Sequence, residues 1–229
     1  MSAPQLESQL ASVNQRIVEA CSKTKRNCDD VALLAVSKTK PLADIITLYQ
    51  AGHRQFAENY AQEGVEKCQQ APFDDAIWHF IGPLQSNKTK LIAEHFDWVH
   101  TIDREKIARR LSDQRPPEKP PLNLLIQVNI SQDPAKSGVT AAQAVTLAKQ
   151  ISVLPNVRLR GLMTILEAQL SEQHRLAQFQ ELKKLQQALI KEHPDCKELS
   201  MGMSSDFELA IQAGATMVRV GSDIFGKRS

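Results

Sequence analysis

Short apolar runs recur along the chain between longer amphipathic stretches, a pattern typical of alternating strands and helices. We expect eight strands, at residues 31–36, 53–57, 77–81, 97–101, 123–129, 157–164, 198–201 and 216–220. The helical periodicity between the strands is clearest at residues 42–51, 140–154 and 172–192. Each of these stretches is long enough to cross over between two parallel strands, so the pattern predicts repeated β–α units.

Residues at the helix ends support the same arrangement. Gly52 and Gly214 each follow a helical stretch and precede a strand, where glycine commonly ends a helix in the left-handed conformation. Ser205 and Glu208 have the spacing of a capping box. This spacing predicts that a helix begins directly after the seventh strand.

Eight β–α units predict a closed (β/α)8 barrel of the TIM type, an α/β fold whose usual length is about 250 residues with a lower bound of about 200. An extra helix, at residues 4–21, precedes the first strand, and we expect a single domain over residues 1–229. An open doubly wound sheet is the alternative. It is disfavoured because no strand is followed by the glycine-rich phosphate loops of nucleotide-binding sheets.

Composition and charge exclude several classes of protein. The 229 residues carry a formal net charge of +2 and are 42% hydrophobic, which fits a globular domain and argues against a nucleic-acid partner. The sequence has no secretory signal and no run of about 20 apolar residues, so we expect a cytoplasmic protein with no membrane partner. The four cysteines lack metal-motif spacing, and we expect reduced thiols and no metal site.

Chemistry in such a barrel is expected at the carboxyl ends of the strands. Strand one ends in Ser37 and Lys38, one of which points toward the barrel mouth because side chains alternate along a strand. A partly desolvated lysine there can form a Schiff base with a carbonyl compound, although a solvated loop lysine is the plainer interpretation. On the last strand, the alternation turns Arg219 inward, where it needs an acceptor. A structural ion pair with Glu58 or Glu198 is as well supported as a bound ligand.

The loops after the last two strands are rich in serine and glycine. Residues 200–206 follow strand seven, and Gly221 and Ser222 follow strand eight, where barrels commonly bind phosphate. Serine and glycine also serve simply to cap and turn. Because strand one closes against strand eight, a lysine, an arginine and a phosphate nest become neighbours, and these are the elements of a pyridoxal phosphate site. An arginine at the pyridine nitrogen would weaken the ring as an electron sink.

A resemblance to a known family is carried by nine stretches in order. They are LLAVSKTKP (33–41), ENYAQEG (58–64), WHFIGPLQSNK (78–88), HTIDR (100–104), VNIS (128–131), KSG (136–138), RGLMTI (160–165), LSMGMSSDFELAI (199–211) and VRVGSDIFG (218–226). The sequence resembles the pyridoxal phosphate homeostasis protein family, single-domain relatives of the alanine racemase barrel, over essentially the whole chain. It departs from the family pattern at Ala57, where glycine is usual, and at Leu166, where many members have proline.

The resemblance implies a fold type III pyridoxal phosphate-binding barrel without a C-terminal β-domain, with the cofactor held covalently on Lys38 as a Schiff base. It also implies that Arg219 faces the pyridine nitrogen and that Asn59 lies near the cofactor. The residues that it implies for the phosphate are Met203, Ser204, Gly221 and Ser222. The family is described as supporting pyridoxal phosphate homeostasis without established turnover, so we expect a binding protein with no catalytic residues.

Chain length distinguishes a carrier from an enzyme. Racemases of the related fold draw a second base from an additional C-terminal domain and a dimer partner, for which 229 residues are too few. We therefore expect a monomer that buffers pyridoxal phosphate or delivers it to apo-enzymes. The alternative is an amino-acid racemase or lyase of low activity, with Tyr60 as a candidate base; a sensor that contacts a protein partner is a third hypothesis. Lys136 is a second candidate amine, although a surface lysine is the simpler interpretation, and His79, Trp78 and Trp98 are expected in the core.

Overall fold

A closed ring of parallel strands forms the centre of the molecule. The structure, a computed structural model, describes residues 1–131, 133, 136–167 and 169–226; residues 132, 134–135, 168 and 227–229 of the expected 1–229 domain lie outside the described residues. Within the described ranges, β1 to β8 pair in chain order and β8 closes against β1. The strands are β1 (Ala32–Val36), β2 (Gln55–Glu58), β3 (Ile77–Phe80), β4 (Trp98–Ile102), β5 (Leu122–Gln127), β6 (Val157–Met163), β7 (Glu198–Met203) and β8 (Met217–Val220).

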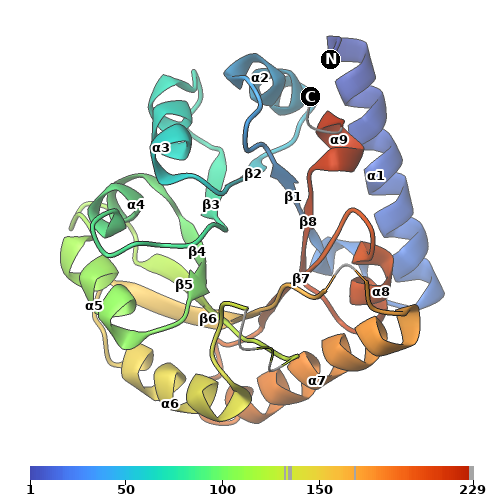
Figure 1. Cartoon of the computed structure of the whole chain (residues 1–229). Coiled ribbons are helices and arrows are strands. Elements are labelled where there is room, and N and C mark those ends of the chain that lie inside the picture. The colour runs from blue at the N-terminus through green and yellow to red at the C-terminus, as the bar shows by residue number, and fades with distance from the viewer. Residues whose placement is uncertain (132, 134–135, 168, 227–229) are drawn as a thin grey trace.

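Helices surround this ring on the outside (Figure 1). They are α1 (Ala3–Lys23), α2 (Leu42–Gln50), α3 (Ala61–Gln70), α4 (Thr89–His95), α5 (Glu105–Gln114), α6 (Ala141–Ser152), α7 (Glu172–Ile190), α8 (Phe207–Gln212) and α9 (Ser222–Phe225), with a 3-10 turn at Cys28–Asp30. The first helix precedes the barrel and packs against α2, α8 and α9. The first and last described helices, α1 and α9, therefore lie side by side near the junction of β1 and β8 (Figure 1).

The (β/α)8 barrel predicted from the hydrophobic pattern is confirmed, including the extra N-terminal helix. Each expected strand is present within a few residues of its predicted bounds. Gly52 and Gly214 follow α2 and α8 with φ angles of 93° and 102°, which confirms the left-handed helix ends.

Two local predictions around β7 are wrong. The strand continues to Met203 because its pairing with β8 shifts register after Ser200 and resumes at Met203 opposite Arg219. The capping box at Ser205 and Glu208 does not form: α8 begins at Phe207, and the Glu208 carboxylate accepts a hydrogen bond from Arg16 Nε at 2.8 Å.

Alternation along the strands divides the apolar core into two parts. Val218 and Val220 face outward and join the large cluster between the strands and the helices, whereas Met217 faces the barrel interior. The interior cluster is small and consists of Leu34, Ala57, Ile81, Leu125, Met163 and Met217. Polar side chains fill much of the remaining interior, which is unusual because branched apolar residues dominate most barrels of this type.

The four cysteines, Cys21, Cys28, Cys68 and Cys196, are free thiols, as predicted. Burial raises the pKa of Cys196 to about 12, so this thiol is unreactive at neutral pH. Within the described part of the chain, no helix has the length and apolarity needed to cross a bilayer.

Replacing Gly161 by alanine should disrupt the pairing of β6 with β7. An added Cβ would lie 1.9 Å from the carbonyl oxygen of Glu198, so the two backbones would have to separate. We expect a loss of about 3 kcal/mol or more in the free energy of unfolding, measured by urea titration. Gly52→Ala is the matched control, because its Cβ meets no atom within 4 Å and only the left-handed φ opposes it, at about 1–2 kcal/mol. Equal losses in both variants would contradict this reasoning.

Candidate functional site

A cavity of about 370 Å³ opens at the carboxyl ends of the strands, mainly beside β1, β7 and β8. This volume is within the range of about 300–1,000 Å³ that is usual for small-molecule sites. All seven residues predicted to contact a cofactor line it: Lys38, Asn59, Met203, Ser204, Arg219, Gly221 and Ser222. The structure therefore brings the whole predicted set together, while the binding role of each residue stays a prediction.

The end of β1 separates the two candidate residues of strand one. Ser37 is fully buried and points outward, where its hydroxyl donates to Glu58 Oε1 at 2.6 Å. Lys38, the next residue, follows the inward series of Leu34 and Val36 and lines the cavity. Lys38, and not Ser37, is thus the residue of strand one at the barrel mouth.

Lys38 is the second residue of a tight turn. The amide of Lys40 donates to the carbonyl of Ser37 at 3.0 Å, and Thr39 between them has a φ of 61°. A β-branched residue in this left-handed region is unusual and costs roughly 1–3 kcal/mol. Lys40, also at the cavity, donates from Nζ to the carbonyl of Phe225 at 2.9 Å, which fastens the turn to α9.

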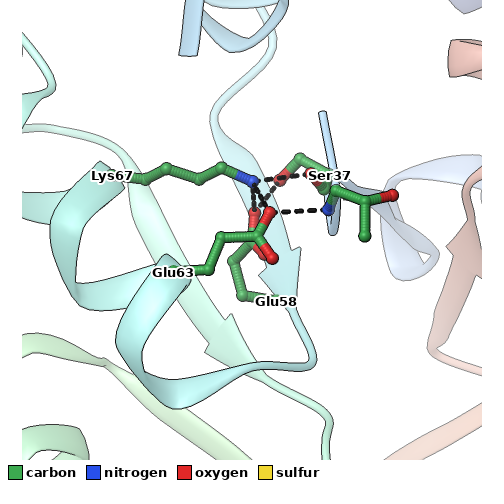
Figure 2. Close-up of polar contacts among 5 residues, drawn as sticks. Ser37, Glu58, Glu63 and Lys67 are labelled. Atoms are coloured by element: carbon green, nitrogen blue, oxygen red, sulfur yellow. Dashed lines mark hydrogen bonds and ion pairs between the residues drawn. The ribbon is translucent and has the colours of Figure 1, made fainter. Parts of the chain in front are cut away.

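A buried ion-pair cluster lies behind this turn, between β2 and α3 (Figure 2). The ammonium group of Lys67 donates to Glu58 Oε1 at 2.8 Å, to Glu63 Oε1 at 2.6 Å and to the carbonyl of Ser37 at 2.7 Å. The Glu58 side chain is fully buried, and burial raises the pKa of its carboxyl group despite the opposing charge of Lys67. Sequence reasoning named Glu58 only as a possible partner of Arg219.

Arg219 is held inside the barrel by neutral acceptors. Its Nη1 donates to Ser200 Oγ at 2.7 Å and its Nη2 to the carbonyl of Thr164 at 2.9 Å. Burial lowers the pKa of Arg219 to about 10, against an opposing effect of Asp206. Because this value is well above neutral, the guanidinium group presents a full positive charge at the wall of the cavity.

The predicted structural ion pair of Arg219 with Glu58 or Glu198 is wrong. Glu58 points to the outer face of the barrel and pairs with Lys67. Glu198 lies at the start of β7, where it accepts from Thr216 Oγ1 at 2.6 Å. Both carboxylates are thus engaged elsewhere, which leaves the charge of Arg219 available to a ligand in the cavity.

A chain of buried hydrogen bonds continues from Arg219 through the barrel interior. Ser200 Oγ lies 2.8 Å from His100 Nδ1, and His100 Nε2 lies 3.0 Å from His79 Nδ1. Ser200 Oγ accepts from Arg219, so its own hydrogen can be donated to His100 Nδ1, and His100 Nε2 can donate in turn to His79 Nδ1. Burial lowers the pKa of both imidazoles, so both rings are neutral at neutral pH. In the described structure, His79 Nε2 is buried without a partner.

Sequence reasoning placed His79 in the core, where it is fully buried, but missed its connection to Arg219. It also missed His100 and Thr164, and it assigned Ser200 to the loop after strand seven, whereas Ser200 lies within β7. One signal was available in the strand alternation, because both histidines occupy inward positions on neighbouring predicted strands. The contacts of Ser200 and Thr164 depend on strand register across the barrel, which the hydrophobic pattern does not contain.

The loops on the far side of the cavity supply hydroxyl and backbone groups. Met203 ends β7 and Ser204 follows it. The amide of Met203 donates to Asp206 Oδ1 at 2.7 Å, which fixes the loop. Gly221 and Ser222 lead from β8 into α9. Opposite them, the side-chain oxygen of Asn59 is buried and accepts no hydrogen bond from any described residue. A ligand that offers a donor there would satisfy it.

Two other candidate residues lie away from the described lining of the cavity. Tyr60 precedes α3, and half of its surface is exposed. Lys136 pairs with Glu167, with Nζ 3.3 Å from the carboxylate. Neither residue is among the described residues that line the cavity.

Comparison with known proteins identifies the family. The family model described as alanine racemase, N-terminal domain, matches residues 12–229. A pyridoxal phosphate homeostasis protein from Vibrio cholerae is 53% identical over 227 residues, which cover 97% of this chain and 96% of that protein. The chain belongs to the pyridoxal phosphate homeostasis protein family. A solved structure, that of PipY from Synechococcus elongatus with pyridoxal phosphate bound, superposes with a TM-score of 0.85 at 36% identity. The alignment covers 97% of this chain and 100% of the PipY chain.

This homeostasis-family chain also shares its fold with alanine racemase. The enzyme from Clostridium difficile superposes with a TM-score of 0.79 at 13% identity. The alignment covers 98% of this chain and 57% of the racemase. At this identity, the superposition shows that the two proteins share the barrel fold.

The two buried histidines should make this family member sensitive to acid. Burial lowers the pKa of His79 to about 3 and that of His100 well below its usual value of 6.5. As the pH falls below about 6.5, the unfolded chain binds these protons and the folded chain does not, so stability is present above this pH and is lost toward pH 3. Each histidine contributes up to about 1.4 kcal/mol per pH unit to the slope of the free energy of unfolding against pH.

Urea titrations between neutral and mildly acidic pH would measure this dependence. His79→Gln removes one of the two protons and should flatten the slope accordingly. His174→Gln, which removes an exposed imidazole, is the matched control. Equal slopes for the wild type and the His79 variant would contradict the assignment.

Proposed function

We propose that this chain binds pyridoxal phosphate, holds it as a Schiff base on Lys38, and buffers or delivers it as part of intracellular pyridoxal phosphate homeostasis in the cytoplasm. The observation that carries the proposal is the convergence of a lysine amine, a buried cationic arginine and a serine- and glycine-lined loop on one cavity. The named function of the relatives and the cofactor bound to PipY support the same choice of ligand.

The residues present fit this cofactor. Its aldehyde suits Lys38, and its phosphate suits Ser204 and Ser222 together with the backbone at Met203 and Gly221. Arg219 provides a donor for the ring nitrogen, and Asn59 has an unsatisfied oxygen for a donor on the ligand. Pyridoxal phosphate supplies a reactive aldehyde and a conjugated ring when bound.

The proposed bond forms without any redox change. The unprotonated amine of Lys38 adds to the aldehyde carbon, a C=N bond forms, and one water molecule leaves. The reverse reaction with water, or exchange with an incoming amine, frees Lys38 and releases the carbonyl compound or its new imine. The bond is thus strong enough to retain the ligand and reversible enough to deliver it to apo-enzymes.

The polar residues at the cavity favour a carrier over a racemase or lyase. Among the described residues that line it, the side-chain amines are those of Lys38 and Lys40, and no carboxylate, imidazole or phenol is present there. Tyr60, the candidate second base, lies outside this lining. Arg219 at the ring nitrogen would also keep that nitrogen unprotonated and weaken carbanion stabilisation. We therefore propose a monomeric binding protein without physiological turnover.

Lys38→Ala should abolish the visible absorption band that a lysine imine of pyridoxal phosphate produces. Lys40→Ala removes the other lysine amine at the cavity and should retain the band. Reduction of the wild-type complex with borohydride, followed by mass spectrometry, should place the adduct on Lys38. A band that survives in Lys38→Ala, or an adduct on another lysine, would contradict the assignment.

Delivery can be tested separately from binding. The loaded protein should restore activity to an apo-enzyme that depends on pyridoxal phosphate, even when free cofactor is trapped by a scavenging enzyme. Racemisation or elimination of amino acids should remain far below the usual enzyme range of about 1–1,000 per second. Turnover within that range would refute the carrier proposal, and failure of transfer under trapping would refute delivery.

A further inference from the structure

The turn that presents Lys38 has a backbone conformation that its own sequence disfavours. Thr39 occupies the third position of the turn with a φ of 61°. This position usually carries glycine or asparagine, because other side chains are strained there and β-branched ones especially so. The turn from Ser37 to Lys40 therefore needs support from outside itself.

That support acts on both peptide groups that flank Lys38 (Figure 2). Lys67 Nζ donates to the carbonyl of Ser37 at 2.7 Å, which belongs to the peptide group before Lys38. Glu63 Oε1 accepts from the amide of Thr39 at 2.6 Å, which belongs to the peptide group after Lys38. The two contacts fix the backbone on either side of the lysine while their own side chains lie on the outer face of the barrel.

The supporting side chains are themselves tied together. Lys67 and Glu63 are joined at 2.6 Å on successive turns of α3. Glu58, from β2, accepts from both Lys67 and the Ser37 hydroxyl. All three hydrogens of the Lys67 ammonium group are thus used. This arrangement joins β1, β2 and α3 at the point where Lys38 leaves the strand.

Stability alone does not account for such a cluster. Burying an ion pair costs desolvation energy, and well-packed apolar residues often stabilise a protein as much or more. What apolar residues cannot supply is directional bonds to a backbone carbonyl and a backbone amide. The cluster supplies both, and it supplies them to the two peptide groups adjoining Lys38.

We propose that Glu63 and Lys67, supported by Glu58, are positioning residues that hold the strained turn so that Lys38 points into the cavity. The inference rests on the proposed role of Lys38 as the amine that binds pyridoxal phosphate. Without the cluster the turn relaxes toward unstrained conformations, the competent orientation of Lys38 becomes a minor one, and the apparent affinity falls by the same factor.

The test is a titration of apo-protein with pyridoxal phosphate, followed by the lysine-imine absorption band. Lys67→Met and Glu63→Ala should each raise the dissociation constant by about tenfold. Glu63→Gln keeps an oxygen that can accept from the Thr39 amide, so its dissociation constant should rise less than that of Glu63→Ala. Circular dichroism establishes that each variant is folded at the temperature used, and the milder Glu63 variants carry the test if Lys67→Met does not fold.

Rescue distinguishes positioning from a general structural role. Thr39→Gly removes the strain at the turn, so adding it to Glu63→Ala should recover most of the lost affinity. Arg115→Met is the matched control. Arg115 lies between α5 and β5 and is a buried cation that also donates to backbone carbonyls, those of Ala93, Phe96 and Pro120. This control should lower stability and leave the dissociation constant of the folded protein unchanged.

Unchanged affinity in folded Glu63→Ala and Lys67→Met would overturn the positioning role and leave the cluster as a link between α3 and the barrel. Lack of rescue by Thr39→Gly would overturn it as well. Failure of the proposed function gives a different result, because the wild-type protein would then form no band that depends on Lys38.

Discussion

The parallel pairing of β8 with β1 is the constraint on which the site depends. It places Leu34 opposite Arg219 and Ala35 opposite Val220, so the strand that leads to Lys38 lies beside the one that leads to Gly221. These residues come from opposite ends of the chain, and neither end could form the cavity alone. Barrel closure thus brings the amine of Lys38, the cation of Arg219 and the start of α9 to one cavity, with β1, β8 and α9 side by side in Figure 1. The long α1 helix packs against α2, α8 and α9, the helices that adjoin this junction in the chain.

The buried charge of Arg219 determines the chemistry of the barrel interior. A guanidinium group can only donate, so it needs acceptors inside the barrel, and hydrogen bonds continue from Ser200 through His100 to His79. Burial lowers the pKa of both imidazoles, so the side chains behind the cation are neutral. Polar side chains thus replace apolar packing in part of the barrel interior, and they hold one cation in a fixed orientation. The lost apolar packing indicates that the orientation of the cation matters.

The sequence predicts the fold well because its information is local and periodic. Apolar runs define the strands, and Gly52 and Gly214 mark helix ends through backbone conformation alone. The alternation of side chains along a strand also predicts that Arg219 points into the barrel and that either Ser37 or Lys38 points toward the barrel mouth. The acceptors of Arg219 and the cluster of Glu58, Glu63 and Lys67 depend instead on register and on the position of α3 over β2, which no local pattern encodes. The capping-box prediction is wrong for a related reason, because the Glu208 carboxylate binds Arg16 of α1, a helix distant in sequence.

The two sides of the site are built on different physical principles. Arg219 is held by Ser200 and the carbonyl of Thr164 within the barrel, and the hydrogen bonds continue behind it to His100 and His79. The Lys38 turn is held in a conformation that Thr39 resists, by bonds from outside the barrel wall. A permanently charged group can be fixed once, whereas the exchange proposed for Lys38 would require its amine to return to the same position each time. Directional bonds to the two flanking peptide groups suit that role, because they act on the backbone at Lys38.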